Sequence, residues 1–245
     1  MQYRVLATDY DGTLATDGCV FPETVQSLDK LRASGRKLIM VTGRELPEIQ
    51  SIFPEFRLFD VVVAENGGLI YWPADNREEP LADPPPAEFL AEMRRQHVEP
   101  SSTGRVIFAT RHPFETVILQ TIQRLGIGYQ IIFNKGSVMV LPSNVNKATG
   151  LQAVLRRMQI AGDNVVGVGD AENDHAFLET CAVAVAVQNA LPALKSRCDL
   201  VTEGDHGRGV SELIDHLLAD DLQSLGPRRP RTKVDHPPLP KQADG

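Results

Sequence analysis

Two aspartates near the amino terminus follow directly on an apolar run, and this stretch constrains the fold more than any other part of the sequence. The run Val5-Leu6-Ala7-Thr8 leads into Asp9 and Asp11, and Gly12 follows. A short run with little polar character is typical of a strand buried on both faces, as in a parallel sheet. Because Gly12 lets the backbone turn, both carboxylates can converge on one point at the carboxyl end of the strand. Carboxylates held this close repel each other, so either one keeps a proton or a metal and basic side chains offset the charge, and we expect the rest of the sequence to supply cations.

Apolar runs of this kind recur along the chain and alternate with segments of helical periodicity. Strands are expected at 37–41, 60–64, 165–168, 182–187 and 200–201, and residues 69–72 are expected to turn back from the strand at 60–64. Helices are expected at 46–53, 147–158, 174–180, 191–197 and 210–218, and a first one begins at Pro22 and ends before Gly35. This alternation predicts an α/β fold with a Rossmann-like parallel sheet and right-handed crossovers.

A different pattern interrupts the alternation between residues 73 and 142. Pro80 and the run Pro84-Pro85-Pro86 break the periodicity, as a linker between two units would. Helices at 87–95 and 113–125 and strands at 104–110, 129–133 and 137–141 are expected to follow. The sequence therefore predicts a core of residues 1–72 and 143–222, with a small α+β cap of residues 73–142 inserted into it.

Residues 223–245 form the third predicted part, a basic tail rich in proline. From Gly226 onward the chain has no apolar periodicity, and five basic against two acidic residues give it a charge of +3, which leaves −10 for the rest. Such a composition predicts a disordered tail. Two alternatives stay open: a linker to another domain, or a segment whose basic charge contacts nucleic acid.

Composition and net charge exclude several classes of protein. With 42% hydrophobic and 23% charged residues among 245, the chain has an ordinary globular composition, and its net charge of −7 argues against a general nucleic-acid binder. Three scattered cysteines without a CxxC pair argue against a disulfide framework or a zinc site. We see no leader before the first strand and no apolar run near the ~20 residues that span a bilayer. We therefore expect a cytoplasmic protein that contacts no membrane and is a monomer or a dimer.

A second group of acids follows the predicted strand at 165–168. Asp170 and Asp174 lie at a strand-to-helix junction, so they can reach the edge of the sheet at which Asp9 and Asp11 lie. Carboxylates without neighbouring histidine or cysteine favour a hard ion, and Mg²⁺ binds through a few carboxylates together with a substrate phosphate. The alternative is that these acids cap the following helix, which is worth about 1 kcal/mol. Because capping needs one acid and several gather here, we favour a Mg²⁺ site.

Basic residues are predicted close to these acids. Lys147 begins a helix, where its charge opposes the helix dipole, so an anion is its natural partner. Thr42 and Arg44 follow the strand at 37–41, where a hydroxyl and backbone amides can hold phosphate oxygens. Arg44 is also compatible with an ordinary surface or salt-bridging arginine.

Four motifs occur in an order that resembles the phosphatases of the haloacid dehalogenase superfamily. They are the stretches 9–13 and 42–44, Lys147, and the stretch 169–174. The sequence is similar to the Cof-type branch, whose cap lies between the second and third motifs, and the resemblance covers about residues 3–219. The insertion is short for that branch and is closest in size to the caps of small phosphatases that resemble archaeal phosphoglycolate phosphatase.

The resemblance implies a role for each motif residue. Asp9 would attack phosphorus to form an aspartyl-phosphate, and Asp11 would protonate the leaving oxygen and then deprotonate the hydrolytic water. An aspartate at position 11 points to hydrolysis of a phosphate ester. The implied phosphate ligands are Thr42, Gly43 and Lys147. The implied Mg²⁺ ligands are Asp9, the backbone carbonyl of Asp11, Asp170 and Asp174, the last either as a ligand or as a supporting residue.

Selection of the substrate is expected from the cap. Candidates there are Arg105, Arg111, His112 and Lys135, each of which is also compatible with an ordinary surface residue. On the core, Arg44 is a further candidate, and Asn66 matches a family position that often contacts substrate.

Our leading hypothesis is a Mg²⁺-dependent phosphatase for a small phosphorylated metabolite, either a sugar phosphate or a phosphorylated carboxylic acid such as phosphoglycolate. Two alternatives stay open. One is a phosphotransferase, and the other is a regulatory phosphate-binding domain that the tail tethers to a larger partner.

Overall fold

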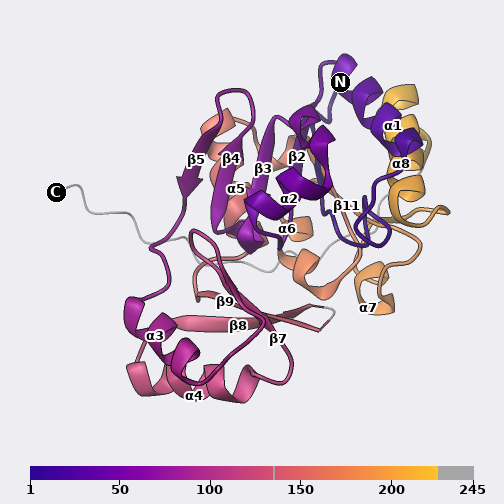
Figure 1. The fold of residues 1–245 in the computed structure, drawn as a ribbon. Helices are drawn as coiled ribbons and strands as arrows, with labels where there is room; N and C mark the ends of the chain where they lie inside the picture. Colours follow the sequence, from indigo (N-terminus) through magenta and orange to yellow (C-terminus); the bar gives the residue numbers. More distant parts are fainter. Residues whose placement is uncertain (135, 226–245) are drawn as a thin grey trace.

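The computed structural model describes residues 1–134 and 136–225, which form a large sheet flanked by helices and a smaller sheet beneath it in Figure 1. The expectations for Lys135 and for residues 226–245 lie outside the described residues. Gln223–Leu225 form a short 3₁₀ turn, and Leu225 packs against the core. The folded chain therefore extends slightly beyond the predicted boundary at residue 222.

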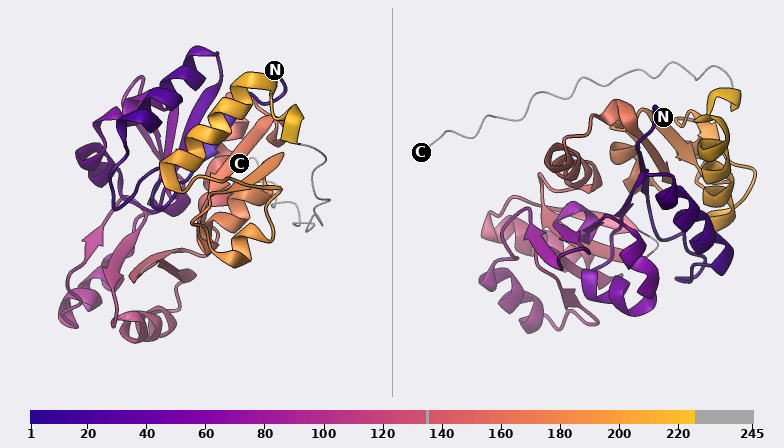
Figure 2. Two further views of the ribbon diagram at one scale, coloured as in Figure 1. Left: turned by 90° about the vertical axis from the view of Figure 1, so that its right-hand side faces the viewer. Right: turned by 90° about the horizontal axis from the view of Figure 1, so that it is seen from above.

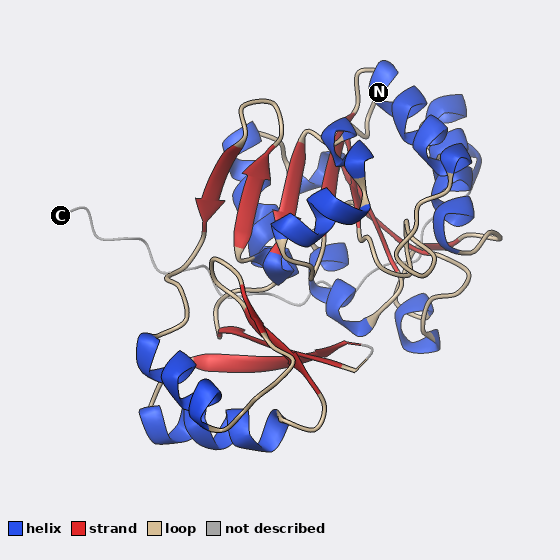
Figure 3. Cartoon of the chain, viewed as in Figure 1, coloured by secondary structure: helices blue, strands red, loops and turns tan. Residues whose placement is uncertain are grey.

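The large sheet has eight strands in the order β12-β11-β10-β1-β2-β3-β4-β5. Figure 3 shows strands in red and the helices around them in blue. The six strands from β12 to β3 run parallel, which confirms the predicted α/β fold, and β4 and β5 are antiparallel additions. All four residues of β1 are buried between β10 and β2, which explains the apolar character of this strand. The strands are β1 (Val5–Thr8), β2 (Lys37–Val41), β3 (Val61–Ala64), β4 (Leu69–Trp72), β5 (Arg77–Pro80), β10 (Val165–Gly169), β11 (Val183–Ala186) and β12 (Leu200–Val201).

Strand β5 changes the predicted domain boundary. Residues 77–80 are predicted to belong to the cap, but they form the edge strand of the core sheet. Their sequence, Arg-Glu-Glu-Pro, has no apolar residue for a pattern to detect, and an edge strand tolerates the proline because it pairs on one side only. The cap therefore begins after Pro80 rather than at residue 73.

Helices cover both faces of the large sheet (Figure 2). Helix α1 packs against α8, and α5 packs against α6. Asn146 caps α5, because its side chain accepts a hydrogen bond from the backbone N–H of Thr149 at 3.0 Å, and this fixes Lys147 as the first residue of the helix. The helices of the core are α1 (Pro22–Ala33), α2 (Leu46–Ile52), α5 (Lys147–Met158), α6 (His175–Glu179), α7 (Pro192–Lys195) and α8 (His206–Asp220).

The cap consists of a four-stranded antiparallel sheet, in the order β6-β7-β9-β8, and two helices on the face away from the core (Figure 1). Phe89 of α3 and Ile118 of α4 pack against Phe108 and Val140 of the sheet. The cap elements are α3 (Ala87–Arg95), β6 (Ser102–Thr103), β7 (Phe108–Arg111), α4 (Glu115–Leu125), β8 (Tyr129–Asn134) and β9 (Ser137–Pro142).

The strand predicted at 104–110 is shorter in the structure. Only Phe108–Arg111 form β7, because the backbone N–H groups of residues 105–107 donate to the carboxyl group of Glu65 instead of to a neighbouring strand. Within residues 1–134 and 136–225, no helix combines the length and apolar character needed to cross a membrane.

Candidate active site

The polar residues that follow the central strands meet at one edge of the large sheet. Asp9 follows β1, Thr42 follows β2, Asp170 follows β10, and Lys147 opens α5. Because these strands are parallel, their carboxyl ends share one edge. All four side chains are buried. Buried polar groups must be satisfied by one another or by a bound ion, so their contacts define what the site can hold.

Lys147 links two of the acids. Its Nζ lies 2.5 Å from Asp9 Oδ1 and 2.7 Å from Asp174 Oδ1, and its side chain is 1% exposed. Burial alone would lower the pKa of this ammonium, but the carboxylates of Asp174 and Asp9 outweigh burial and raise the pKa. Lys147 therefore stays cationic and offsets part of the negative charge of the site.

The carboxyl groups of Asp9, Asp170 and Asp174 form a buried cluster that can hold a metal ion. One oxygen of each lies within 4.8 Å of the other two. The hydroxyl of Thr13 donates to Asp9 Oδ2 at 3.0 Å and also lies 3.3 Å from Asp170 Oδ1, so it orients both groups. A donor set made only of oxygen atoms suits a hard divalent cation.

Asp174 differs from Asp9 because it accepts three hydrogen bonds, two of them from backbone N–H groups, whereas Asp9 accepts two, both from side chains. Oδ1 accepts from Lys147, and Oδ2 accepts from the backbone N–H groups of Asp170 at 2.9 Å and Ala171 at 3.0 Å. Gly169 makes room for this arrangement, since a Cβ atom there would lie 2.7 Å from Asp174 Oδ2. This geometry favours a supporting role for Asp174, which holds the Asp170 loop and Lys147 together.

The charge of the cluster is unbalanced without a further cation. Burial raises the pKa of Asp9 to about 8, with Asp174 and Asp170 adding to the rise and Lys147 opposing it. One ammonium therefore does not compensate three buried carboxyl groups. A divalent cation would favour the ionised form of Asp9, so the residues present fit such an ion.

Asp11 lies two residues from Asp9 but has a different partner. Arg44 binds it through two hydrogen bonds, from Nε to Oδ2 and from Nη2 to Oδ1, both 2.7 Å long. Arg44 also pairs with Glu48 and lies over the ring of Tyr10, 5.8 Å from its centre. The hydrogen bonds to Asp11 raise the pKa of Arg44, so the guanidinium stays charged. The two carboxylates of the first motif therefore pair with different cations, Asp9 with Lys147 and Asp11 with Arg44.

Thr42 and Gly43 precede Arg44 in the loop after β2. Thr42 is buried, and its Oγ1 accepts a hydrogen bond from the backbone N–H of Arg44 at 3.1 Å. A Cβ atom at position 43 would lie 3.4 Å from Sδ of Met139 in β9. This loop of the core therefore lies directly beneath the cap.

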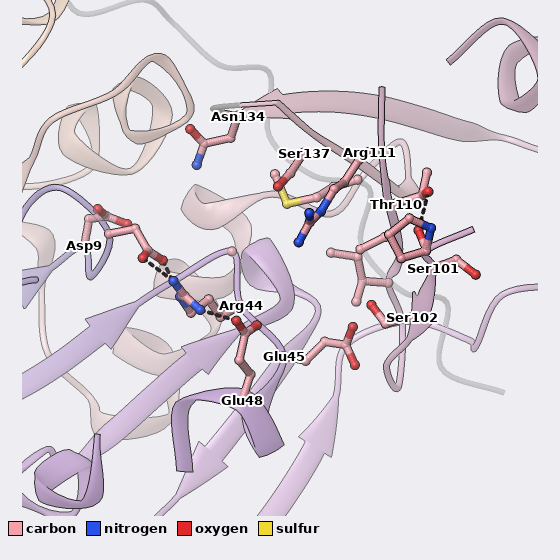
Figure 4. Close-up of a pocket in the computed structure, with 16 residues that line it drawn as sticks. Asp9, Arg44, Glu45, Glu48, Ser101, Ser102, Thr110, Arg111, Asn134 and Ser137 are labelled. Carbon is pink, nitrogen blue, oxygen red and sulfur yellow. Dashed lines mark hydrogen bonds and ion pairs between the residues drawn. The ribbon is translucent and has the colours of Figure 1, made fainter. Parts of the chain in front are cut away.

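A cavity of about 600 Å³ separates this edge of the core from the cap (Figure 4). Arg111, at the end of β7, extends from the cap toward the side on which Arg44 and Glu45 lie. Within the described part of the chain, no carboxylate forms an ion pair with Arg111. From the core the cavity is lined by Asp9, Asp11, Gly43, Arg44, Glu45 and Glu48, and from the cap chiefly by Ser101, Ser102, Ile107, Thr110, Arg111, Asn134, Ser137 and Met139.

Three other candidates for substrate binding lie outside this cavity. Arg105 points to the core surface, where its Nε donates to Glu78 Oε2 at 2.7 Å and the side chain is mostly exposed. His112 stacks on Phe133, with ring centres 5.8 Å apart. Asn66 is buried and does not line the cavity, and its backbone N–H donates to the carbonyl of Thr42 at 2.9 Å. Arg105 and Asn66 therefore do not line the cavity, and their roles in substrate binding stay predictions.

The cavity also contains residues that the sequence analysis did not single out. Glu45 and Glu48 directly follow the Thr-Gly-Arg motif, and this adjacency was the one signal available for them. Burial raises the pKa of Glu45, while a hydrogen bond from Ser102 of the cap opposes the rise. Asn134, Ser137 and Met139 carry no such signal because only the folding of the cap brings them to the site.

Known proteins are similar to this chain over most of its length. Residues 6–93 and 99–214 match the family described as haloacid dehalogenase-like hydrolase. Among curated relatives, phosphoglycolate phosphatase 2 of Saccharolobus solfataricus is 30% identical over 231 residues, covering 89% of this chain and 94% of the relative. Phosphoglycolate phosphatase of Methanothermobacter thermautotrophicus is 28% identical over 224 residues, covering 88% and 99% of the two chains.

Solved structures share the fold at low sequence identity. A haloacid dehalogenase-like hydrolase from Bacteroides thetaiotaomicron superposes with a TM-score of 0.77 at 18% identity, covering 88% of this chain and 99% of that one. A HAD/COF-like hydrolase from Plasmodium vivax superposes with a TM-score of 0.74 at 20% identity, covering 91% and 97% of the two chains. These likenesses support the fold alone.

Proposed function

Because this chain belongs to the haloacid dehalogenase-like hydrolases and is a phosphoric monoester hydrolase, we propose that it is a Mg²⁺-dependent phosphatase for a small phosphorylated carboxylic acid. The observation that carries the proposal is that two neighbouring carboxyl groups have different partners. Asp9 lies in the buried cluster with Lys147, whereas Asp11 faces the cavity on Arg44. In the proposed reaction Asp9 would attack phosphorus, and Asp11 would transfer the proton.

The reaction then follows in two displacements at phosphorus. An oxygen of Asp9 attacks, the bond from phosphorus to the ester oxygen breaks, and Asp11 gives its proton to the leaving oxygen. Asp11 next takes a proton from water, which attacks the aspartyl-phosphate and releases inorganic phosphate and the Asp9 carboxylate. Lys147 and the backbone amides after Thr42 bind the phosphoryl oxygens, so positioning and charge lower the barrier.

Asp9, Asp170 and the backbone carbonyl of Asp11 would hold Mg²⁺, and Asp174 would support them. The ion would supply the positive charge that lets a phosphate dianion approach a carboxylate.

We expect Mg²⁺ to stabilise the metal-free protein more at pH 8 than at pH 5.5. Burial raises the pKa of Asp9 to about 8, well above its value in the unfolded chain. At a pH between the pKa of Asp9 in the unfolded chain and its pKa in the folded protein, the folded protein keeps a proton that the unfolded chain has lost. The contribution of Asp9 to the free energy of unfolding therefore falls as the pH rises. Mg²⁺ must displace this proton, which is easier at high pH.

The measurement is a thermal unfolding curve with and without Mg²⁺ at each pH. At 100 times the dissociation constant, the ion adds about 2.7 kcal/mol to the free energy of unfolding. The Asp170→Asn variant should lose this effect, and the Asp163→Asn variant, which changes an exposed acid far from the site, should keep it. An equal stabilisation in both variants would remove Asp170 from the metal site.

Arg111 is the group that we propose to bind the carboxylate of the substrate. It extends into the cavity, and no described carboxylate pairs with it. Arg44 is less suitable because Asp11 and Glu48 already occupy it. Two curated relatives named phosphoglycolate phosphatases support a substrate of this class.

Two matched substrates test this assignment, 2-phosphoglycolate and ethyl phosphate, which lacks the carboxylate. Arg111→Gln should raise the KM for 2-phosphoglycolate by roughly 10- to 100-fold, because a charge-assisted pair is lost, and should change ethyl phosphate hydrolysis by less than about threefold. Arg105→Gln, which removes a cap arginine outside the cavity, should alter neither. Equal losses on both substrates would contradict a carboxylate-binding role.

A panel of phosphorylated metabolites, assayed with Mg²⁺, tests the function as a whole. Phosphorylated carboxylic acids should show the highest kcat/KM. A preference for sugar phosphates would exclude the proposed substrate class, and transfer of phosphate to added glycerol in place of water would identify a phosphotransferase. Absence of turnover on every phosphomonoester would overturn the proposal.

A further inference from the structure

Glu65 is a buried acid of the core whose side chain contacts the backbone of the cap. It directly follows β3 and is 1% exposed. Its Oε1 accepts from the N–H of Arg105 at 2.9 Å, and its Oε2 accepts from the N–H groups of Val106 at 2.8 Å and Ile107 at 3.0 Å. Three successive N–H groups that converge on one carboxylate form an anion-binding concavity, here filled by a side chain.

Gly104 makes this concavity possible. A Cβ atom at position 104 would lie 2.5 Å from Glu65 Oε1 and 2.8 Å from Oε2, and the three nearest heavy atoms to it all belong to this carboxyl group. The space beside Gly104 is therefore occupied by the Glu65 carboxylate. We call the contact between Glu65 and the N–H groups of residues 105–107 the Glu65 latch.

The core end of the latch is tied to the loop that carries the phosphate-binding residues. The N–H of Glu65 donates to the carbonyl of Arg44, and the N–H of Asn66 donates to that of Thr42, both at 2.9 Å. Glu65 and Asn66 both take the left-handed backbone conformation, with φ of 52°, which few residues other than glycine adopt readily. The structure therefore maintains a strained turn at the point where this loop meets the cap.

The cap end of the latch leads directly to the residues that line the cavity. Ile107, the last residue whose N–H binds Glu65, faces the cavity, and β7 follows with Thr110 and Arg111. Because residues 105–107 lead directly into β7, which pairs with β9 along Phe108–Arg111, we expect their displacement to shift Arg111 together with the cap sheet, whereas Asp9 and Lys147 belong to the core.

We propose that Glu65 is a positioning residue that fixes the Arg111 strand over the reacting carboxylates and so sets the selectivity of the enzyme for its leaving group. The choice of test substrate rests on the proposed function, but the contact itself does not. Without the latch, the residues that bind the phosphoryl group keep their positions, but Arg111 is no longer held in place relative to them.

The first test replaces Glu65 by glutamine, which keeps the shape and the left-handed backbone but leaves one good acceptor for three N–H groups. We expect the KM for 2-phosphoglycolate to rise roughly 10- to 100-fold, with kcat less affected, because all three hydrogen bonds lose their charge assistance and at least one N–H group loses its acceptor. Hydrolysis of p-nitrophenyl phosphate should change by less than about threefold, since its reactive leaving group needs little from the cap. A variant that is merely less folded would lower both activities equally.

Glu78→Gln is the matched control. Glu78 also contacts Arg105 from the core, through its side chain on the exposed surface. Ion pairs between exposed side chains contribute little to the free energy of unfolding, so both activities should stay within about twofold of the wild type.

A second test uses Gly104. In the wild-type background, Gly104→Ala should displace the carboxylate and reproduce the selectivity loss of Glu65→Ala. In the Glu65→Ala background, Gly104→Ala should change the ratio of the two activities by less than about twofold, because the added methyl group then occupies the space that the Glu65 carboxylate has left. Effects that multiply independently in the double variant would contradict the latch.

Amide hydrogen exchange gives a readout that needs no substrate. The N–H groups of residues 105–107 should exchange at least about tenfold faster in Glu65→Gln and should be unchanged in Glu78→Gln. Unchanged exchange together with an unchanged ratio of the two activities would overturn the proposal. If the wild type fails on every phosphomonoester, the proposed function is wrong, and the exchange experiment still decides on the latch.

Discussion

Replacing Asp9 by asparagine is expected to lower kcat on p-nitrophenyl phosphate by about 10⁴-fold or more, because the amide cannot form an aspartyl-phosphate. The same change should not unfold the protein. Burial raises the pKa of Asp9 to about 8, so the ionised carboxylate is a cost to the metal-free fold, and its removal should leave stability at pH 8 equal or higher. Steady-state kinetics with Mg²⁺ and thermal unfolding without it measure the two effects separately.

Asp11→Asn is the informative comparison for this prediction. It retains the nucleophile, and p-nitrophenolate leaves without a general acid, so about one equivalent of p-nitrophenol should be released in a burst. Hydrolysis of the aspartyl-phosphate should then be slow because water is no longer activated. Asp29→Asn, an isosteric change at an exposed position, should behave as the wild type. Turnover above about 1% in Asp9→Asn would show that another residue attacks phosphorus.

The positions of the acids and the lysine followed from the sequence because a general rule governs them. Parallel strands end at one edge, so Asp9 and Asp170, each directly after an apolar run, were bound to meet there. Lys147 opens a helix at the same edge, and its unfavourable position relative to the helix dipole indicated an anionic partner. These inferences use only periodicity and the ends of elements, which local sequence records.

Other features depend on contacts that leave no local pattern. The pairing of Asp11 with Arg44 joins residues 33 positions apart, and nothing in either motif distinguishes it from a surface ion pair. The Glu65 latch replaces strand pairing with contacts to a side chain, so the strand predicted at 104–110 begins only at Phe108. Arg105 and Arg111 are both arginines of the cap, and only the fold directs one to the core surface and the other to the cavity.

Replacing Lys147 by methionine is expected to damage both activity and stability. The ammonium contacts Asp9 at 2.5 Å and Asp174 at 2.7 Å, and all three side chains are at most 5% exposed. Removing one member of a buried ion pair leaves an uncompensated charge and typically costs about 3–5 kcal/mol of unfolding free energy. The loss of a positive charge at the phosphoryl site should lower kcat by at least about 10²-fold.

The pH dependence of this destabilisation separates a lost charge from a lost packing contact. Without the ammonium, the pKa of Asp9 in the folded protein should rise further, so protonation relieves the defect as the pH falls. Urea unfolding of the metal-free variant should therefore show a smaller loss at pH 5.5 than at pH 8, because only the charged form of Asp9 needs Lys147. Lys37→Met is the matched control, since Lys37 pairs with Asp60 at 2.8 Å but is half exposed, and it should cost less than about 1 kcal/mol at either pH. If both variants lose the same stability, or the Lys147→Met loss does not vary with pH, the buried ammonium serves packing rather than charge balance, and the phosphoryl site would have to take its positive charge from the metal and the backbone amides alone.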